Sequence, residues 1–219
     1  MGGLSLTAVV FDFDGTLVDT NKVKRSGFFE VVATDPQGSE TMAAVLDRVT
    51  GDRRKIFETY LADRLPQHAP SRSQHANELI AAYSYLVDAR VAFADEIEGA
   101  SALLHGLRRA GMRLYLSSAT PLDNLQHIIE QRQWTHHFDE IFGAPTPKVD
   151  TLRNLVRRHG GQATQIAVVG DGEDDRSSAR DVGCAFFPVG DFRSGRNSDT
   201  RIFSLKELAA LLLDTRDRE

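Results

Sequence analysis

Two aspartates separated by one residue, Asp12 and Asp14, are the side chains best suited to chemistry in this sequence. They follow a short β-branched and aromatic run at 8–11, which is typical of a strand buried on both faces. Carboxylates at the end of such a strand are costly to desolvate unless a positive charge lies between them. Gly15 allows the backbone to turn sharply just after them. The pattern therefore favours a cation site over the simpler alternative, a solvated acidic turn.

A second acidic cluster follows another buried apolar run at 166–169. It contains Asp171 and Asp175 within the sequence GDGEDD. Between the two clusters, a strand predicted at 113–116 leads into Ser118, and a predicted loop at 143–148 holds Lys148. Because ligand-binding residues of parallel sheets gather at the carboxyl ends of the strands, we expect these side chains to meet at one edge of a sheet.

Carboxylates gathered in this way repel one another and hold protons strongly unless a cation separates them. Oxygen ligands of this kind suit Mg²⁺, which commonly shares its coordination sphere with a substrate phosphate. A hydroxyl and a lysine beside the metal would neutralise and orient a phosphoryl group. One carboxylate could then attack phosphorus and form an aspartyl-phosphate, which water would hydrolyse.

The elements that must position these residues alternate between strand and helix from about residue 99 onward. Strands are predicted at 140–142 and 185–189, besides those at 113–116 and 166–169, with amphipathic helices between them and a last helix opened by a Ser204–Glu207 capping box. A polar loop is expected at 190–200. This alternation predicts an α/β fold with a doubly wound, mostly parallel sheet and helices on both faces.

The segment at 20–95 has a different character. It contains amphipathic stretches of helical period, interrupted by helix breakers, and no convincing strand. We therefore predict a helical cap at 20–95, inserted into an α/β core formed by 1–19 and 96–219.

Length and composition restrict the class of protein to which this chain can belong. The chain has 219 residues, 41% of them hydrophobic and 26% charged, which is ordinary for a globular protein. A net charge of −5 gives no reason to expect nucleic-acid or membrane binding. Cys184 is the single cysteine, so an internal disulfide is excluded and a reducing, cytoplasmic location is expected. Neither a signal peptide nor a membrane-spanning run is expected. The oligomeric state is left open.

Taken together, the motifs resemble those of the haloacid dehalogenase superfamily of phosphohydrolases. The likeness is to the branch that carries a helical cap after the first motif, and within it to phosphoglycolate phosphatases. The sequence DFDGTLVDT at 12–20 looks like the first motif, Ser118 the second, Lys148 the third and GDGEDD at 170–175 the fourth. The resemblance covers nearly the whole chain and is weakest across the cap.

The resemblance implies a role for each acidic residue. Asp12 would be the nucleophile and a Mg²⁺ ligand. Asp14 would be the general acid and base, with its backbone carbonyl on the metal. Asp171 would be the third protein ligand, and Asp175 would complete the metal site by orienting bound water or Lys148. Asp174 or the neighbouring glutamate, Glu173, could also join the metal shell.

Phosphate binding is likewise implied by the resemblance. Ser118 and the amide of Ala119 would bind the phosphoryl oxygens, and Lys148 would hold the nucleophile and the phosphate together. Ser117 could replace Ser118 in this role. In the cap, Arg53 belongs to a basic run at 53–55 that could clamp a substrate anion, although the pattern favours a solvated basic turn.

The leading functional hypothesis is a Mg²⁺-dependent phosphomonoesterase that acts on a small phosphorylated metabolite. One alternative is a phosphomutase similar to β-phosphoglucomutase, although Lys24 occupies the position where those relatives carry a histidine. Another is a catalytically idle, phosphate-binding regulatory protein on the same fold. Dehalogenation is disfavoured because Asp14 is present and dehalogenases do without the second aspartate.

Overall fold

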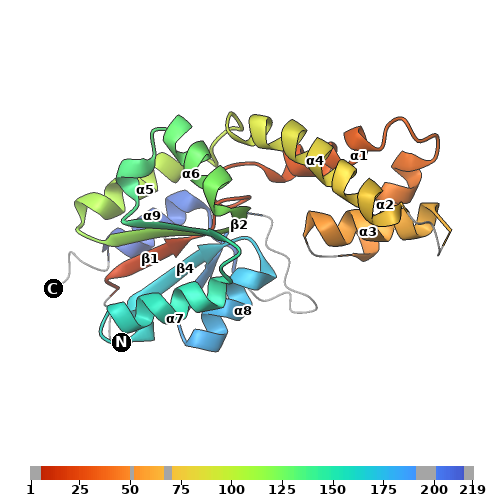
Figure 1. Ribbon diagram of the computed structural model, residues 1–219. Coiled ribbons are helices and arrows are strands. Elements are labelled where there is room, and N and C mark those ends of the chain that lie inside the picture. Colours follow the sequence, from red (N-terminus) through yellow and green to blue (C-terminus); the bar gives the residue numbers. More distant parts are fainter. Residues whose placement is uncertain (1–5, 50–51, 67–70, 191–200, 215–219) are drawn as a thin grey trace. The chain divides into compact units, whose positions relative to one another are not determined.

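The computed structural model describes residues 6–49, 52–66, 71–190 and 201–214 (Figure 1). The polar loop expected at 190–200 lies outside the described residues, except for Gly190. The chain divides into two compact units. We call Met1–Thr20 with Ala94–Glu219 the core unit, and Asn21–Phe93 the helical unit.

The core unit is built on a five-stranded sheet in which every pairing is parallel. The strand order is β3-β2-β1-β4-β5, so the first strand of the chain lies at the centre and is buried throughout. This confirms the predicted α/β fold class. The strands are β1 (Ala8–Phe11), β2 (Arg113–Pro121), β3 (Glu140–Ala144), β4 (Ile166–Gly170) and β5 (Ala185–Pro188).

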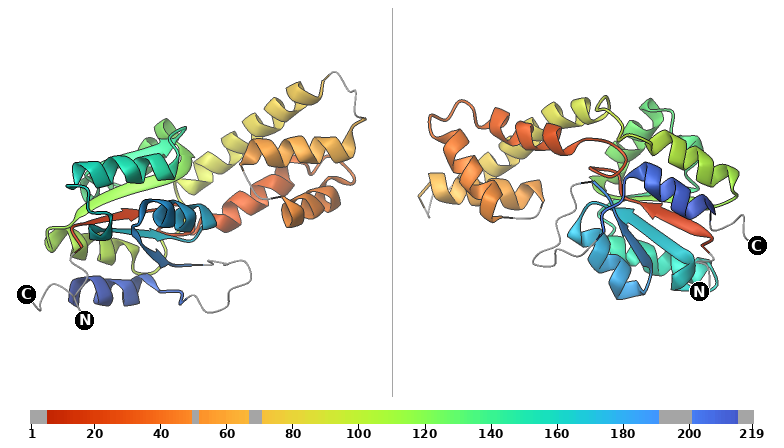
Figure 2. Two further views of the ribbon diagram at one scale, coloured as in Figure 1. Left: turned by 90° about the horizontal axis from the view of Figure 1, so that it is seen from below. Right: turned by 180° about the vertical axis from the view of Figure 1, so that it is seen from behind.

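Helices cover both faces of this sheet. From β1 the chain moves to β2 and β3 through α5 and α6. It then crosses back to β4 and β5 through α7 and α8, in the opposite direction along the sheet. Because the crossovers are right-handed, the two pairs of helices lie on opposite faces. Helix α9 packs against α5, and Figure 2 shows it on the side of the sheet opposite to α7. The helices are α5 (Ala100–Arg109), α6 (Leu122–Gln131), α7 (Lys148–Arg158), α8 (Glu173–Val182) and α9 (Leu205–Asp214).

The core on one face joins alternate residues of the central strands to the apolar sides of α7 and α8. Val10, Tyr115 and Val168 pack there against Leu152, among others. The single cysteine, Cys184, belongs to this cluster. Its burial raises the pKa of the thiol to about 11, which keeps it protonated and unreactive.

Two predicted boundaries differ from those observed. Strand β2 continues to Pro121 instead of stopping near 116, because its far end still pairs with Ala144 of β3 after an irregularity in the register. Helix α6 therefore begins only at Leu122. Lys148 is the first residue of α7 and does not lie in the preceding loop.

The two connections to the helical unit are paired with each other inside the core unit. Val18 and Glu96 form an isolated antiparallel bridge. The amide of Asp19 donates to the carbonyl of Asp95 at 2.9 Å, and the amide of Ile97 donates to the carbonyl of Leu17 at 2.9 Å. The chain therefore leaves and re-enters the core unit at neighbouring points.

The helical unit contains α1 (Asn21–Val31), α2 (Gly38–Arg48), α3 (Arg53–Arg64) and α4 (Arg72–Val91). Its interior is aromatic: the ring of Phe28 lies 4.4 Å from that of Tyr83 and 5.3 Å from that of Phe57, between centroids. Helix α1 approaches α4 closely at Gly27, where an added Cβ would lie 2.4 Å from a Val87 methyl. Such contacts bury the apolar stripes that the sequence pattern predicted.

A polar network ties the turn after α1 to α3. Asp35 accepts hydrogen bonds from Tyr60 Oη at 2.7 Å and from Arg64 Nε and Nη2 at 2.7 and 2.6 Å. The hydrogen bonds from Arg64, followed by that from Tyr60, lower the pKa of Asp35 to about 2. Burial, together with the nearby Asp35, raises the pKa of Tyr60 to about 12.

Replacing Asp35 by asparagine is expected to lower the melting temperature of the helical unit by about 2–4 °C at pH 7. The pKa of Asp35 is depressed in the folded state, so its stabilisation is present above about pH 4 and is lost as the pH falls toward 2. The difference in melting temperature between the variant and the wild type should therefore disappear as the pH falls from about 4 to 2. Thermal unfolding followed by circular dichroism measures it. Asp47→Asn, at an exposed position 4.0 Å from Arg25, is the matched control and should change little. A gap that persists unchanged at pH 2.5 would contradict this account.

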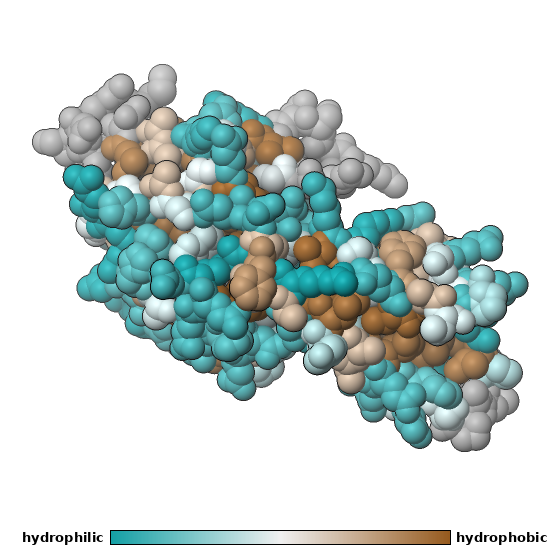
Figure 3. All heavy atoms as spheres, turned by 90° about the horizontal axis from the view of Figure 1, so that it is seen from above, coloured by the Kyte–Doolittle hydropathy of each residue, from teal (hydrophilic) through white to brown (hydrophobic). Residues whose placement is uncertain are grey.

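The surface seen from above is mostly hydrophilic, with separate hydrophobic patches (Figure 3). Within the described ranges, the large hydrophobic side chains that are well exposed are Tyr85, Phe93, Ile202 and Leu211. Among the helices that the structure describes, none combines the length and the apolar composition needed to cross a bilayer.

Candidate active site

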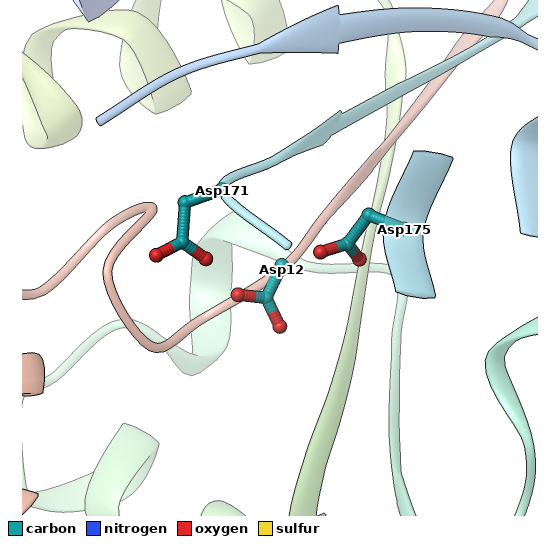
Figure 4. Close-up of side chains that lie close together, drawn as sticks. All are labelled: Asp12, Asp171 and Asp175. Atoms are coloured by element: carbon teal, nitrogen blue, oxygen red, sulfur yellow. The ribbon is translucent and has the colours of Figure 1, made fainter. Parts of the chain in front are cut away.

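Three carboxylates converge at the carboxyl ends of the two central strands (Figure 4). Asp12 follows β1, Asp171 follows β4, and Asp175 lies in the first turn of α8. Each offers a carboxylate oxygen that lies within 4.8 Å of those of the other two. Asp12 and Asp175 are buried and Asp171 is partly exposed, so the cluster opens to solvent on one side. The exposed Glu173 and Asp174 are not part of it.

A single ammonium group lies within this cluster. Lys148 Nζ donates to Asp12 Oδ1 at 2.8 Å and to Asp175 Oδ1 at 2.6 Å, and its side chain is only 11% exposed. Burial by itself lowers the pKa of Lys148, but the charges of Asp12 and Asp175 outweigh burial and raise it. Lys148 is therefore a permanent cation.

Lys148 does not neutralise the whole cluster. Burial and the charge of Asp12 raise the pKa of Asp175 to about 7, although Lys148 acts in the opposite direction. Three hard oxygen donors with one intervening ammonium retain negative charge at neutral pH, which is the environment that a divalent cation stabilises. The residues present therefore fit a Mg²⁺ ion, and Asp171 lies at the solvent-exposed side of the cluster.

Asp14 lies in a different environment, although only one residue separates it from Asp12. Its carboxylate accepts hydrogen bonds from Thr20 Oγ1 at 2.7 Å, Thr120 Oγ1 at 2.9 Å and Ser118 Oγ at 3.2 Å. Three hydroxyl donors therefore hold this carboxylate in one orientation. Asp12 thus belongs to the carboxylate cluster, whereas Asp14 is surrounded by hydroxyl groups.

The local backbone explains this separation. The amide of Asp12 still donates to Val169 of the neighbouring strand at 2.9 Å, so Asp12 continues the β1 ladder. Gly15 has φ of 78°, a conformation that favours glycine. Its amide donates to the carbonyl of Val18 at 2.8 Å, which closes the turn. Thr16, fully buried in this turn, donates to Asp12 Oδ2 at 3.3 Å.

The two adjacent serines of β2 point to different neighbours, because successive side chains alternate along a strand. The hydroxyl of Ser118 contacts Asp14, whereas Ser117 lies beside Lys148 and Asp175. The amide of Thr120 donates to Ser118 Oγ at 3.0 Å, and Ala119 between them is exposed.

Of the residues that the sequence predicts for the site, the structure brings Asp12, Lys148, Asp171 and Asp175 together and joins Asp14 to Ser118. Arg53 lies in the helical unit, where its guanidinium donates to Ser84 Oγ at 2.8 Å. The sequence does not single out Thr20 or Thr120. The available signal for Thr20 is its place at the end of the acidic first motif, and for Thr120 its place two residues after Ser118.

Comparison with known proteins agrees with this geometry. A family model described as haloacid dehalogenase-like hydrolase matches residues 9–189. A phosphoglycolate phosphatase of Vibrio cholerae is 24% identical over 191 residues, covering 84% of each protein. Another from Aliivibrio fischeri is 34% identical over 91 residues, and the match spans 40% of that protein. A tyrosine-protein kinase, PtkA of Mycobacterium tuberculosis, is 28% identical over 198 residues, covering 86% of this chain and 63% of the kinase.

Solved structures show the same fold. A predicted phosphoglycolate phosphatase from Haemophilus somnus superimposes with a TM-score of 0.71 at 20% identity, covering 97% of this chain and 99% of that one. CbbY from Rhodobacter sphaeroides, solved in complex with phosphate, gives 0.64 at 22% identity, covering 93% and 96%. The parallel sheet, the acidic cluster at its carboxyl edge and a family model spanning 9–189 lead to one conclusion. The chain belongs to the haloacid dehalogenase-like hydrolase family.

Proposed function

We propose that this protein is a Mg²⁺-dependent phosphomonoesterase that hydrolyses a small phosphorylated metabolite through an aspartyl-phosphate. The observation that carries the proposal is the buried contact of Lys148 with Asp12 and Asp175, beside Asp171. It combines a nucleophile, a cation site and a fixed positive charge at one point. The curated relatives named phosphoglycolate phosphatase support a phosphoric monoester as the substrate.

In this proposal Asp12, Asp171 and the backbone carbonyl of Asp14 hold the metal, and Asp175 completes the site. When bound, Mg²⁺ supplies positive charge that screens the carboxylates from the phosphoryl group. Lys148 supplies further positive charge from the protein itself and holds the Asp12 carboxylate in one orientation. Ser118 and the amide of Ala119 bind the phosphoryl oxygens.

The first half-reaction exchanges one phosphorus–oxygen bond for another. A carboxylate oxygen of Asp12 attacks phosphorus, and the bond to the leaving oxygen breaks. Asp14, in its protonated form, gives its proton to that oxygen, so the alcohol leaves neutral. The product is an acyl phosphate on Asp12.

The second half-reaction restores the enzyme. Asp14, now ionised, accepts a proton from water, and the resulting hydroxide oxygen attacks phosphorus while the bond to Asp12 breaks. The hydroxyls of Thr20 and Thr120 still donate to Asp14 at this stage and hold its carboxylate in place, while Ser118 binds the phosphoryl group. Inorganic phosphate is then released.

Substrate selection is assigned to the helical unit, as a cap with the predicted bounds 20–95. Arg53 is the candidate clamp for a second anionic group of the substrate, such as the carboxylate of phosphoglycolate. To act in this way it would exchange its hydrogen bond with Ser84, a neutral partner, for one with a charged group.

The test is Mg²⁺-dependent release of phosphate from 4-nitrophenyl phosphate, followed by a panel of phosphorylated metabolites that includes phosphoglycolate. Removing Mg²⁺ with a chelator is expected to lower turnover by about 100-fold or more, and added Mg²⁺ should restore it. Retention of Mg²⁺ without release of phosphate from any ester would overturn the proposal and favour the regulatory alternative. Transfer of phosphate between positions of a sugar phosphate would favour the phosphomutase.

A further inference from the structure

A small cavity adjoins the ion pair of Lys148 with Asp175, inside the core unit. Its volume is about 10 Å³, close to the smallest space that accommodates one water molecule. Besides these two side chains, its polar lining comprises Asp12, Ser117 of β2 and Ser178 of α8. The remaining lining is aliphatic and comprises Val10, Leu152 and Val168.

The two serines have no evident role in the mechanism proposed above. Ser117 is 5% exposed and Ser178 is 4% exposed. Within the part of the chain that the structure describes, neither hydroxyl is hydrogen-bonded to another protein group. Buried hydroxyls are almost always hydrogen-bonded, to protein or to ordered water. Because both serines border the cavity, a water there would supply the missing partner.

The ammonium group of Lys148 supplies the second argument. It has three N–H groups, and two of them are directed to Asp12 and Asp175. Since Lys148 also lines the cavity, its third N–H has a place to donate there in the substrate-free protein. A buried cation with an unused donor is destabilised, and a fixed water removes that cost.

We infer that the cavity holds one ordered water, and that Ser117 and Ser178 position Lys148 and Asp175 through it. The water accepts hydrogen bonds from Lys148 Nζ and one serine hydroxyl, and donates to the other serine and to Asp175. Four partners are within the range found for buried waters. Ser117 and Ser178 are thus positioning residues, which act on the nucleophile through Lys148.

The positioning role rests on the proposed phosphatase function, whereas the presence of the water does not. A high-resolution crystal structure of the substrate-free protein should show density for one water in this cavity. The double variant Ser117→Ala, Ser178→Ala removes two of its four partners and should lose that density. An empty cavity in the wild-type protein would overturn the inference, whether or not the enzyme hydrolyses any ester.

Kinetics test the positioning role. The double variant is expected to lower kcat for 4-nitrophenyl phosphate by about 10-fold, because Lys148 and Asp12 are less firmly held, while KM stays within about twofold. Ser177→Ala is the matched control on the same helix, since that exposed hydroxyl donates to the carbonyl of Asp174, and it should leave kcat unchanged. Equal kcat values for the control and the double variant would overturn the positioning role. A double variant that melts at a lower temperature but keeps its kcat would also overturn the positioning role.

Discussion

Replacing Asp12 by asparagine is expected to lower kcat by about four orders of magnitude or more without unfolding the protein. The carboxamide is uncharged and does not attack phosphorus, so no aspartyl-phosphate forms. Asparagine has nearly the same size and can still accept a hydrogen bond from Lys148, which contacts Asp12 at 2.8 Å. Acid quenching of the enzyme with a radiolabelled ester should trap label on the wild-type protein and none on the variant.

The same substitution should not destabilise the metal-free protein. Asp12 is one of three neighbouring carboxylates that face a single ammonium, and its removal relieves their repulsion. The metal-free variant is therefore expected to melt at or above the wild-type temperature. Its stabilisation by added Mg²⁺ should be smaller, since one anionic ligand is gone. Thermal unfolding with and without Mg²⁺ measures both effects.

Asp139→Asn is the matched control in the same unit. Asp139 is also a poorly exposed carboxylate, but its partners are Arg108 and Arg113, at 2.7 Å each. This control should melt lower than the wild type and keep its kcat, which is the reverse of the pattern expected at Asp12. If Asp12→Asn keeps kcat within about 10-fold of wild type, water attacks phosphorus directly and the covalent mechanism is wrong.

Replacing Asp14 by asparagine is the second large change, with an expected loss in kcat of about 10²–10⁴. The loss should depend on the leaving group. An alkyl phosphate needs a proton from Asp14 to leave, whereas 4-nitrophenolate leaves as a stable anion without one. The variant should therefore still release about one equivalent of nitrophenolate in a burst, and then stall because no base activates water. Stopped-flow absorbance measures the burst.

The structure supplies a matched comparison for this variant. Asp123, in the first turn of α6, is exposed, and Asp123→Asn should change neither the burst nor the steady rate. In contrast to that position, Asp14 receives one hydroxyl donor from nearby Thr20 and two from β2, which is distant in the sequence. Equal losses for alkyl and aryl phosphates, with no burst, would show that Asp14 serves structure or metal binding and does not transfer the proton.

Much of the core follows from local sequence patterns. The apolar runs at 8–11 and 166–169 predict buried strands, and the parallel arrangement then brings their carboxyl ends to one edge. That is sufficient to expect Asp12 near Asp171. The capping box at Ser204 and Glu207 is confirmed too, since the Ser204 amide donates to Glu207 Oε2 at 2.8 Å.

Details that depend on contacts between distant residues were not accessible from the sequence. The bonds from Thr120 and Ser118 to Asp14 join residues more than 100 positions apart, and they depend on β2 continuing past its apolar run. The pattern at 117–118 does not reveal which serine faces Asp14, because a shift of one residue exchanges the faces of a strand. The place of Lys148 depends in the same way on the start of α7, which has no capping side chain to mark it.

The pairing of Leu17–Asp19 with Asp95–Ile97 has a consequence for engineering the chain. Because the chain leaves and returns at hydrogen-bonded neighbours, a short turn there can replace residues 21–93 without any change in strand order. The helical unit can therefore be exchanged as a module, since its point of insertion adds no constraint to the sheet.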